Sequence, residues 1–402
     1  MSTIKIRPDV YWIGVNDRKT ELFEGIWPID EFGVTYNCYL IMDEKKALID
    51  LVGSTKSEEF FSKVDELISL SDIDYIIINH MEPDHTGIIP TIKRIVPNAT
   101  ILGTEKMKKM MSQYYGIDSN VQVVADGDIL SLGRKKLQFF QTPFIHWPET
   151  MVTYETTEKI LFSCDAFGGY GAFSGTIFED ECKNLALFER EALRYYSNIV
   201  ATFSGPVLKA IERLRELEIK IIAPSHGLIW RKNPGRIVEL YKRWAECQSG
   251  KSDPGITLIF GSMYGNTEAL MNAVAQGAAK AGVEPEIFDV TRTNVSHILP
   301  SLWTKSGIIV GGPTYEGKLF PPVASVLQMA ALKHIRNKTA VYFGSFGWSG
   351  GALKEMKKII ENLDWNVLDS IEFKGGPTQD LLRKGEALGR NFAEKIKGRV
   401  QK

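Results

Sequence analysis

The chain has 402 residues, which is long for one domain and favours two or three. Apolar residues make up 44% and charged residues 24% of a chain with a net charge of −1, a balance that is typical of globular proteins and argues against a nucleic-acid-binding surface. The N-terminus lacks the apolar core of a signal peptide, and no apolar run is long enough to span a membrane, so we expect a cytoplasmic protein without membrane contact.

The first half of the chain reads as short strands followed by helices. Three apolar runs in succession predict an antiparallel or mixed sheet over residues 9–15, 35–42 and 45–52. A helical pattern follows at 57–70, and further strands are predicted at 74–79, 99–104, 136–142, 159–165 and 219–227. Amphipathic stretches predict helices at 185–216 and 235–247. The pattern predicts an α+β sandwich of sheets with helices outside.

The second half has a different pattern of predicted elements, which begins after the small, polar stretch CQSGKSDPG. Strands and helices alternate strictly, with strands predicted at 256–261, 284–290, 306–312, 339–347 and 365–373 and helices at 266–282, 294–302, 321–333, 350–363 and 378–398. Five such repeats predict a doubly wound parallel sheet. We therefore expect a first domain over 1–248, a linker over 249–254 and a second domain over 255–402.

Three loops at predicted strand ends of the second domain favour a flavin. GSMYGNTEAL runs from a strand directly into a helix, whose free amides and positive dipole end suit a terminal phosphate. GGPTYEG and GSFGWSGGA add glycine-rich turns and aromatic side chains that suit a flat ring system. Together the loops resemble those of flavodoxin, which implies FMN. The implied cofactor-binding residues are Ser262, Met263, Tyr264, Gly265, Asn266, Thr267, Pro313, Thr314, Tyr315, Ser345, Phe346, Gly347, Trp348 and Gly350.

The first domain has four of the six histidines, each near a predicted strand end. These are His80, His85, His146 and His226, and Asp165 follows another strand. Such a repeated placement indicates a metal site better than four core histidines do.

The spacing His80-x-Glu82-x-Asp84-His85 resembles the H-x-H-x-D-H motif of the metallo-β-lactamase fold, with His146, Asp165 and His226 as its remaining ligands. Glu82 replaces an imidazole and makes the site harder and more oxygen-rich, which fits a pair of irons better than redox-inert zinc. Four imidazoles and three carboxylates exceed the needs of one tetrahedral ion, so we expect two metals with Asp165 between them.

A lactamase-like domain with this motif, joined to a flavodoxin-like domain, resembles the flavodiiron proteins, also called A-type flavoproteins. HWP, PSHGLIWRK and FGSFGWSGG are typical of that family as well. The resemblance implies a first iron held by His80, Glu82 and His146. It implies a second iron held by Asp84, His85 and His226, with Asp165 bridging and with His85 as the ligand that some members leave uncoordinated.

The same resemblance implies an oxidoreductase that reduces dioxygen to water, nitric oxide to nitrous oxide, or both. It also implies a head-to-tail homodimer or a dimer of dimers, in which FMN of one chain faces the irons of the other. The sequence ends after the flavodoxin-like part, so we expect an external donor, either a rubredoxin or a reduced deazaflavin coenzyme. Glu24 and Trp27 either tune the preference between the two gases or are surface and packing residues.

Two other functions remain open on the sequence. One is a zinc hydrolase of the lactamase fold with a flavodoxin as regulator, against which Glu82 argues. The other is a non-catalytic flavin electron carrier, which a full set of seven polar ligands disfavours. The cysteines Cys38, Cys164, Cys182 and Cys247 form no C-x-x-C pair, and we expect all four to be buried, reduced thiols.

Overall fold

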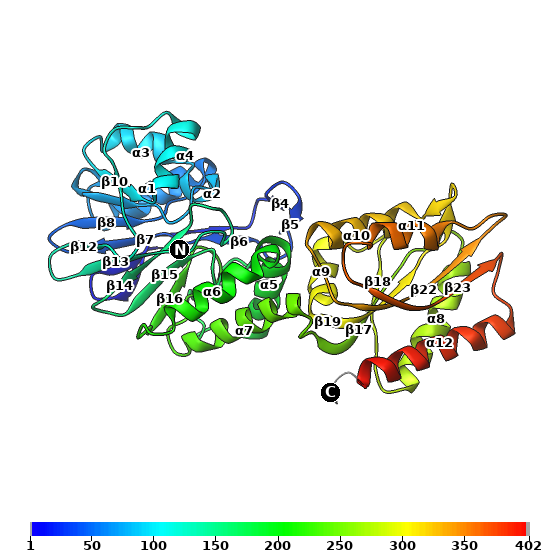
Figure 1. Ribbon diagram of the computed structural model, residues 1–402. Helices are drawn as coiled ribbons and strands as arrows, with labels where there is room; N and C mark the ends of the chain where they lie inside the picture. Colours follow the sequence, from blue (N-terminus) through cyan, green and yellow to red (C-terminus); the bar gives the residue numbers. More distant parts are fainter. Residues whose placement is uncertain (1, 399–402) are drawn as a thin grey trace. The chain divides into compact units, whose positions relative to one another are not determined.

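The computed structural model describes residues 2–398 and divides into two compact units, one up to Lys242 and one from Arg243 (Figure 1). The division falls inside helix α7 (Pro234–Glu246), which a 3-10 turn at Cys247–Ser249 follows. The first strand of the second unit starts at Asp253, so only residues 250–252 of this stretch lie outside helix and strand. We keep 249–254 as the proposed linker.

Two sheets form the centre of the first unit. The first has the order β1-β2-β7-β8-β9-β10-β11, and the second has the order β12-β13-β14-β15-β16. The first sheet consists of β1 (Ile4–Arg7), β2 (Val10–Trp12), β7 (Tyr39–Met42), β8 (Lys46–Ile49), β9 (Tyr75–Ile77), β10 (Thr100–Gly103) and β11 (Val121–Val123). The second consists of β12 (Ile129–Ser131), β13 (Lys136–Gln141), β14 (Met151–Glu155), β15 (Ile160–Cys164) and β16 (Ile221–Pro224). The first sheet is antiparallel up to β8 and parallel beyond it, so it is mixed, as expected.

The two sheets pack face to face around one apolar core. Ile41, Ile49 and Ile77 of the first sheet and Leu137 and Phe162 of the second belong to the same buried cluster. Helices α1–α4 cover the outer side of the first sheet, and α6 and α7 run along β15 and β16 (Figure 1). This arrangement confirms the predicted αββα sandwich.

The helices and minor strands of this unit surround the sandwich. The helices are α1 (Ser57–Asp65), α2 (Pro83–Thr86), α3 (Ile89–Ile95), α4 (Glu105–Tyr115), α5 (Leu185–Tyr195), α6 (Ser204–Leu214) and α7, with 3-10 turns at Ser54–Lys56, Leu70–Asp72 and Ala201–Phe203 and a π-helical turn at Tyr196–Val200. Two small ribbons pair β3 (Val15–Asp17) with β6 (Val34–Tyr36) and β4 (Leu22–Phe23) with β5 (Trp27–Pro28).

The structure contains elements that the sequence did not predict. Helix α4 was missed because it buries only Met107 and Met111, although Thr104 caps it by accepting a hydrogen bond from the Met107 amide. Strand β14 was missed because all five of its residues are buried, which removes the alternation that marks a strand. The predicted helix at 185–216 is instead α5 and α6 separated by the π-helical and 3-10 turns, and the predicted helix from Ser57 ends at Asp65.

The second unit is a single parallel sheet in the order β18-β17-β19-β22-β23. Its strands are β17 (Asp253–Phe260), β18 (Glu286–Asp289), β19 (Lys305–Gly311), β22 (Thr339–Phe346) and β23 (Asn366–Lys374), with a small ribbon of β20 (Thr314–Tyr315) and β21 (Lys318–Leu319). Its helices are α8 (Asn266–Lys280), α9 (Val295–Thr304), α10 (Pro321–Leu332), α11 (Ala352–Ile359) and α12 (Gln379–Lys397). The order 2-1-3-4-5 confirms the doubly wound, flavodoxin-like fold.

Helices α8 and α12 lie on one side of this sheet, and α9, α10 and α11 lie on the other (Figure 1). Two glycines let α8 and α12 approach closely. A Cβ on Gly389 would lie 1.9 Å from the Val274 carbonyl oxygen, and a Cβ on Gly277 would lie 1.9 Å from that of Glu386. A main-chain oxygen has no rotamer to which it can retreat, so any side chain at either position forces the helices apart.

We therefore expect Gly389→Ala to lower the free energy of unfolding of the second unit by about 1–3 kcal/mol, the usual cost of overpacking. In an exposed helix interior, replacing glycine by alanine normally raises stability by about 1 kcal/mol. A decrease in the free energy of unfolding for Gly389→Ala would therefore indicate the close helix contact. Gly205→Ala in α6 is the control, because a Cβ there meets nothing within 4 Å. Denaturant unfolding followed by flavin fluorescence for the second unit and by circular dichroism for the whole chain measures both variants, and an unchanged midpoint for Gly389→Ala would contradict the packing described.

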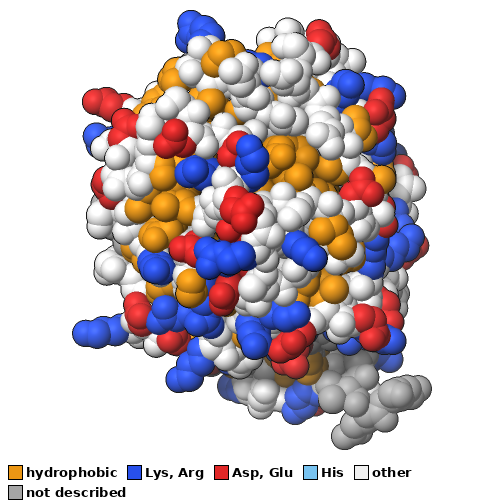
Figure 2. Space-filling view, turned by 90° about the vertical axis from the view of Figure 1, so that its left-hand side faces the viewer, with side chains coloured by type: hydrophobic (Ala, Val, Ile, Leu, Met, Phe, Trp, Pro, Cys, Tyr) orange, Lys and Arg blue, Asp and Glu red, His pale blue; other side chains and the backbone are white. Residues whose placement is uncertain are grey.

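Lysines and arginines alternate with acidic side chains on the face seen in Figure 2, with apolar patches between them. No single sign of charge dominates this face, as the near-zero net charge predicts. Among residues 2–398, none of the helices is both long and apolar enough to cross a membrane.

Candidate functional site

The seven predicted metal ligands come together at one edge of the sandwich. His80, Glu82, Asp84 and His85 lie on the loop and short helix α2 that follow β9 of the first sheet. His146, Asp165 and His226 follow β13, β15 and β16 of the second sheet. Because these strands end at the same edge, residues far apart in the sequence meet in one buried cluster.

Asp165 lies at the centre of the cluster and contacts two pairs of imidazoles. Its Oδ2 is 3.4 Å from Nε2 of both His80 and His146. Its Oδ1 is 3.1 Å from Nε2 of His85 and 3.4 Å from Nε2 of His226. One carboxylate therefore serves two separate positions.

A further carboxylate completes each position. Glu82 Oε2 lies 3.2 Å from Nε2 of His80 and 3.0 Å from Nε2 of His146. The two oxygens of Asp84 lie 3.4 Å from Nε2 of His85 and 3.3 Å from Nε2 of His226. The cluster thus divides into two groups that share Asp165.

The spacing and chemistry of these atoms fit two metal ions. Ligands bound at about 2.1 Å to one ion lie about 3.0–3.4 Å from each other, which is the separation of these nitrogens and oxygens. Several of the atoms are buried without any hydrogen-bond partner: both carboxylate oxygens of Asp84, Oδ2 of Asp165 and Nε2 of His226. Buried polar atoms rarely remain unpaired, so cations between them account for the arrangement.

Mutual attraction sets the protonation of the cluster. Burial opposes protonation of His226, but the close carboxylates of Asp165 and Asp84 outweigh it and raise its pKa to about 10. His146 behaves alike beside Asp165 and Glu82, with a pKa raised to about 9. Burial raises the pKa of the Asp165 carboxyl, but His85, His146 and His226 lower it well below its usual range. The Asp165 carboxylate thus stays ionised, which suits it to bind a cation.

A second layer of contacts, which the sequence analysis missed, supports the ligands. Glu149 Oε1 lies 2.7 Å from Nδ1 of His80, and the backbone oxygen of Thr35 lies 2.6 Å from Nδ1 of His226. The rings of Phe23, Tyr36 and Tyr195 pack around His226. Glu149 directly follows the HWP motif, and this position could have drawn attention to it. Position in the sequence alone, however, does not distinguish a buried acid beside a metal ligand from an acid on the surface.

Glu24 and Trp27 belong to the wall of the cluster. Trp27 is buried, and its indole nitrogen donates to Glu24 Oε2 at 3.0 Å. Burial of the carboxyl group and the charge of Glu82 raise the pKa of Glu24 to about 6. The carboxyl group of Glu24 therefore lies beside a predicted ligand, while a role for either residue in gas preference stays a prediction.

Cys164 also reaches the cluster, where its sulfur lies close to ligand atoms of His85 and Asp165. Burial raises the pKa of its thiol well above the usual range, and a neutral thiol is a poor metal ligand. Cys38, Cys164 and Cys247 are buried and all four cysteines are free, while Cys182 is only half-buried, so the expectation of four buried thiols is wrong for that residue.

The predicted flavin loops meet at the carboxyl ends of β17, β19 and β22, where they line a pocket of about 360 Å³. Predicted residues that line it are Met263, Tyr264, Asn266, Pro313, Thr314, Tyr315, Ser345, Phe346, Gly347 and Trp348. The pocket lies at the switch point between β17 and β19, where doubly wound sheets bind their ligands. The side chains of Tyr264 and Trp348 are 90% and 89% exposed, which leaves two aromatic faces at its rim free to stack on a flat ring.

Other predicted flavin residues support these loops and do not line the pocket. Ser262 accepts a hydrogen bond from the Gly265 amide at 3.1 Å, and Gly265 has a φ of +86°, which places the loop at the start of α8. The Thr267 hydroxyl is 2.9 Å from that of Ser345, and Gly350 also lies outside the lining. The sequence analysis missed Glu316, Gly317, Ser349 and Gly375, which line the pocket.

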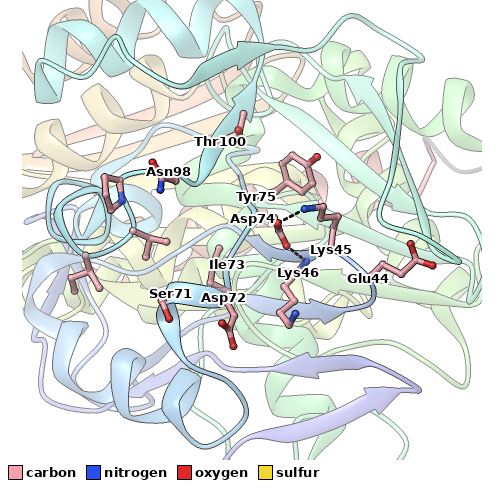
Figure 3. Close-up of a pocket in the computed structure, with 13 residues that line it drawn as sticks. Glu44, Lys45, Lys46, Ser71, Asp72, Ile73, Asp74, Tyr75, Asn98 and Thr100 are labelled. Atoms are coloured by element: carbon pink, nitrogen blue, oxygen red, sulfur yellow. Dashed lines mark hydrogen bonds and ion pairs between the residues drawn. The ribbon is translucent and has the colours of Figure 1, made fainter.

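Another pocket of the first unit, of about 620 Å³, lies at the opposite edge of the first sheet (Figure 3). It includes Lys46, Tyr75 and Thr100, the first residues of β8, β9 and β10. Lys45 and Asp74 in its wall pair with each other at 2.8 Å. Because the metal-ligand loops leave the carboxyl ends of the strands, none of the seven ligands lines this pocket.

Comparison with known proteins agrees with this geometry. A family model described as ODP family beta lactamase matches residues 34–227, and the flavodoxin model matches residues 258–388. The nitric oxide reductase of Moorella thermoacetica is 34% identical over 402 residues, which cover 99% of this chain and 98% of that protein. The anaerobic nitric oxide reductase flavorubredoxin of Escherichia coli is 36% identical over 397 residues, or 97% of this chain and 82% of the relative.

Solved structures are similar over nearly the whole chain. Rubredoxin oxygen:oxidoreductase of Desulfovibrio gigas has a TM-score of 0.94 and 29% identity, covering 99% of this chain and 100% of that one. The flavodiiron protein of Giardia intestinalis has a TM-score of 0.94 and 29% identity, covering 99% and 97%. The flavodoxin domain implies FMN, and the cluster in the first domain has the residues of a non-haem diiron site. The chain therefore belongs to the flavodiiron protein family, a family of oxidoreductases.

Proposed function

We propose that this chain reduces nitric oxide, dioxygen or both at two non-haem irons, with electrons that arrive through FMN. His80, Glu82 and His146 would hold the first iron, and Asp84, His85 and His226 would hold the second. The observation that carries this proposal is the position of Asp165, whose two carboxylate oxygens each face a different pair of imidazoles. The names of the relatives as nitric oxide reductases and as a rubredoxin oxygen:oxidoreductase support the same activity.

Two ferrous ions and reduced FMN together supply four electrons, enough to reduce dioxygen to water, and two suffice to couple two nitric oxide molecules. The residues of the chain prepare the site for this chemistry. Asp165 would hold both irons through its two carboxylate oxygens, and the two ions would supply neighbouring sites for the gas. Phe23, Tyr36, Tyr195 and Trp147 pack against the imidazoles and keep solvent away from them.

The alternative functions find less support. A hydrolytic zinc pair would favour imidazole at the position of Glu82, and the similar proteins with printed activities are oxidoreductases. A simple electron carrier has no use for seven clustered histidines and acids, most of them buried. Zinc without iron in the purified protein would restore the hydrolase, and an iron site inert to both gases would restore the carrier.

An anaerobic single-turnover experiment tests the activity. The fully reduced holoenzyme is mixed with dioxygen and, separately, with nitric oxide, while flavin absorbance and iron oxidation are followed together. We expect both chromophores to be oxidised by at least one gas, and the ratio of the two rates measures the preference. Flavin and iron that both stay reduced with either gas would refute the proposal.

The electron donor is proposed to be a rubredoxin-type protein, because two of the similar proteins carry rubredoxin in their names. A reduced deazaflavin coenzyme is the second candidate. Rapid mixing of oxidised protein with each donor distinguishes them by the rate of flavin reduction. We also propose that the protein works in the cytoplasm, where its four free cysteines would stay reduced.

We propose a head-to-tail homodimer, or a dimer of such dimers, in which the flavin of one copy faces the metal cluster of the other. Two exposed apolar surfaces support this arrangement. In the first unit Leu22, Ile26 and Phe144 are 45%, 55% and 44% exposed, and Phe144 is two residues from His146. In the second unit Tyr264 and Trp348 are exposed at the flavin pocket. Exposed apolar side chains of this kind are expected of surfaces that bind a partner, which supports the proposed association.

We expect the double variant Ile26→Asp with Phe144→Asp to weaken this association, because it places two charges in an apolar contact. Sedimentation should show a shift towards monomer, and electron transfer from flavin to iron should slow in parallel. Ile129→Asp is the control, since Ile129 is 59% exposed on β12, away from both sites. A monomeric variant with full activity would contradict the head-to-tail arrangement.

A further inference from the structure

His80 differs from His85 and His226 in what its second ring nitrogen, Nδ1, contacts. Nδ1 of His80 lies 2.7 Å from the carboxylate oxygen Oε1 of Glu149, whereas Nδ1 of His226 lies against the neutral backbone oxygen of Thr35. Nδ1 of His85 is buried without a hydrogen-bond partner. Of these three Nδ1 atoms, that of His80 alone lies within hydrogen-bond distance of a carboxylate.

Glu149 is held firmly in this position. Its side chain is fully buried, and Oε1 also accepts a hydrogen bond from the Met81 amide at 2.9 Å. The backbone oxygen of Glu149 accepts from the Thr104 hydroxyl at 2.9 Å, and the ring of Trp147 packs on His80 at 5.1 Å. Its other oxygen, Oε2, is buried with no partner, so the carboxylate is directed at His80 through one atom.

A buried carboxylate carries a desolvation cost that two hydrogen bonds through one oxygen compensate only in part. Apolar packing at this position would avoid that cost. The retained charge therefore points to a function, and the group on which it acts most directly is the imidazole of His80.

We propose that Glu149 is a positioning residue, which holds His80 with its proton on Nδ1 and with the lone pair of Nε2 directed at the first metal position. This inference rests on the proposed diiron site. A carboxylate behind a histidine fixes the tautomer and ring orientation and makes the imidazole a stronger donor. Nδ1 of His226, a proposed ligand of the second metal position, contacts only a neutral backbone carbonyl. A carboxylate therefore supports a histidine of the first position but not His226, and we expect loss of Glu149 to weaken metal binding at the first position alone.

Two substitutions separate position from charge. Glu149→Ala removes the contact to His80 altogether. Glu149→Gln retains an oxygen that can accept from both Nδ1 of His80 and the Met81 amide, but it removes the negative charge. The matched control is Glu155→Gln, because Glu155 is also fully buried on β14 and accepts only from the Thr157 and Glu158 amides.

The measurement is Co²⁺ binding to protein from which the metals have been removed by chelation, with the flavin left in place. Cobalt absorption bands count the sites, and a competing chelator gives their affinities. We expect wild type to bind two Co²⁺ per chain and Glu149→Ala to bind one of them about 10- to 100-fold more weakly, the usual loss for such supporting contacts. Glu149→Gln should lose less and shift the absorption band of one ion, and Glu155→Gln should match wild type.

Several results would overturn the inference. They are wild-type affinity at both sites in Glu149→Ala, equal weakening of both sites, or equal weakening in Glu155→Gln. If Glu149→Ala does not fold, Glu149→Gln decides alone, and an unchanged affinity and spectrum there would also overturn it. Wild-type protein that binds no metal pair would instead refute the proposed diiron function, so the two failures are distinguishable.

Discussion

Replacing Asp165 by asparagine is expected to deprive the protein of both metal ions. Asp165 contacts both groups of ligands, with Oδ1 beside His85 and His226 and Oδ2 beside His80 and His146. The amide has the same shape but no charge, and its nitrogen is no metal ligand. Because loss of supporting contacts already costs about 10- to 100-fold, we expect loss of the ligand itself to reduce gas reduction by more than about 100-fold.

Iron analysis, flavin absorbance and single-turnover oxidation together test this expectation. FMN should remain bound, because its pocket is built from the second unit alone. Asp43→Asn is the control. The side chain of Asp43 is 2% exposed, and its carboxylate accepts from the Lys135 amide at 2.6 Å beyond the end of β7, away from the cluster. A variant Asp165→Asn that retains two irons per chain would show that Asp165 does not bridge them.

His226→Ala is expected to have a narrower effect, the loss of one iron and of nearly all activity. His226 faces Asp84 and Oδ1 of Asp165, which belong to the second group of ligands, and it makes no comparable contact with Glu82. The first group therefore keeps its full set of ligands. One remaining ferrous ion cannot couple two nitric oxide molecules at adjacent positions.

Metal content and flavin content after purification measure this result. One iron per chain with a full complement of FMN is the expected outcome. Loss of both irons would show that the two positions are not separable, and parallel loss of flavin would show that the division into a metal domain and a flavin domain is wrong. The iron content of His226→Ala is then compared with that of Asp165→Asn. A ligand shared by both metal positions should cost two irons when replaced, and an unshared ligand should cost one.

The helices and strands of the second unit were predicted closely, because most of them are determined by residues that are near each other in the sequence. Its central strands are short apolar runs, and two of its helices begin at side-chain caps. Asn294 accepts from the Ser296 amide at the start of α9, and Thr378 accepts from the Leu381 amide at the start of α12. The flavin loops were recognisable for the same reason, since glycines and aromatic residues follow directly after strands. The lining residues Glu316 and Gly375 escaped prediction, because they reach the pocket through the β20–β21 ribbon and the end of β23.

The first unit was predicted less well in its elements than in its site. Strand β14 and helix α4 were missed, and the predicted helix at 185–216 was wrong where Tyr196–Val200 forms a π-helical turn. The seven predicted ligands nevertheless meet in one cluster, because their selection rested on histidines and acids at strand ends and not on the exact bounds of the elements. The residue types of the predicted ligands and their spacing can be read from the sequence even where the predicted helices and strands are wrong.

Residue types and short-range periodicity thus sufficed for the two fold classes. They also predicted the proposed ligand set and flavin loops, since each of these predictions depends on neighbours in the chain. The sharing of Asp165 between two imidazole pairs and the contact of Glu149 with His80, 69 positions away, appear only after the two sheets pack. Such contacts depend on the relative position of β9, β13 and β15, which the apolar core of the sandwich sets. Local sequence patterns do not encode these long-range contacts. The packing of the two sheets is therefore what brings the predicted ligands together into one proposed metal site.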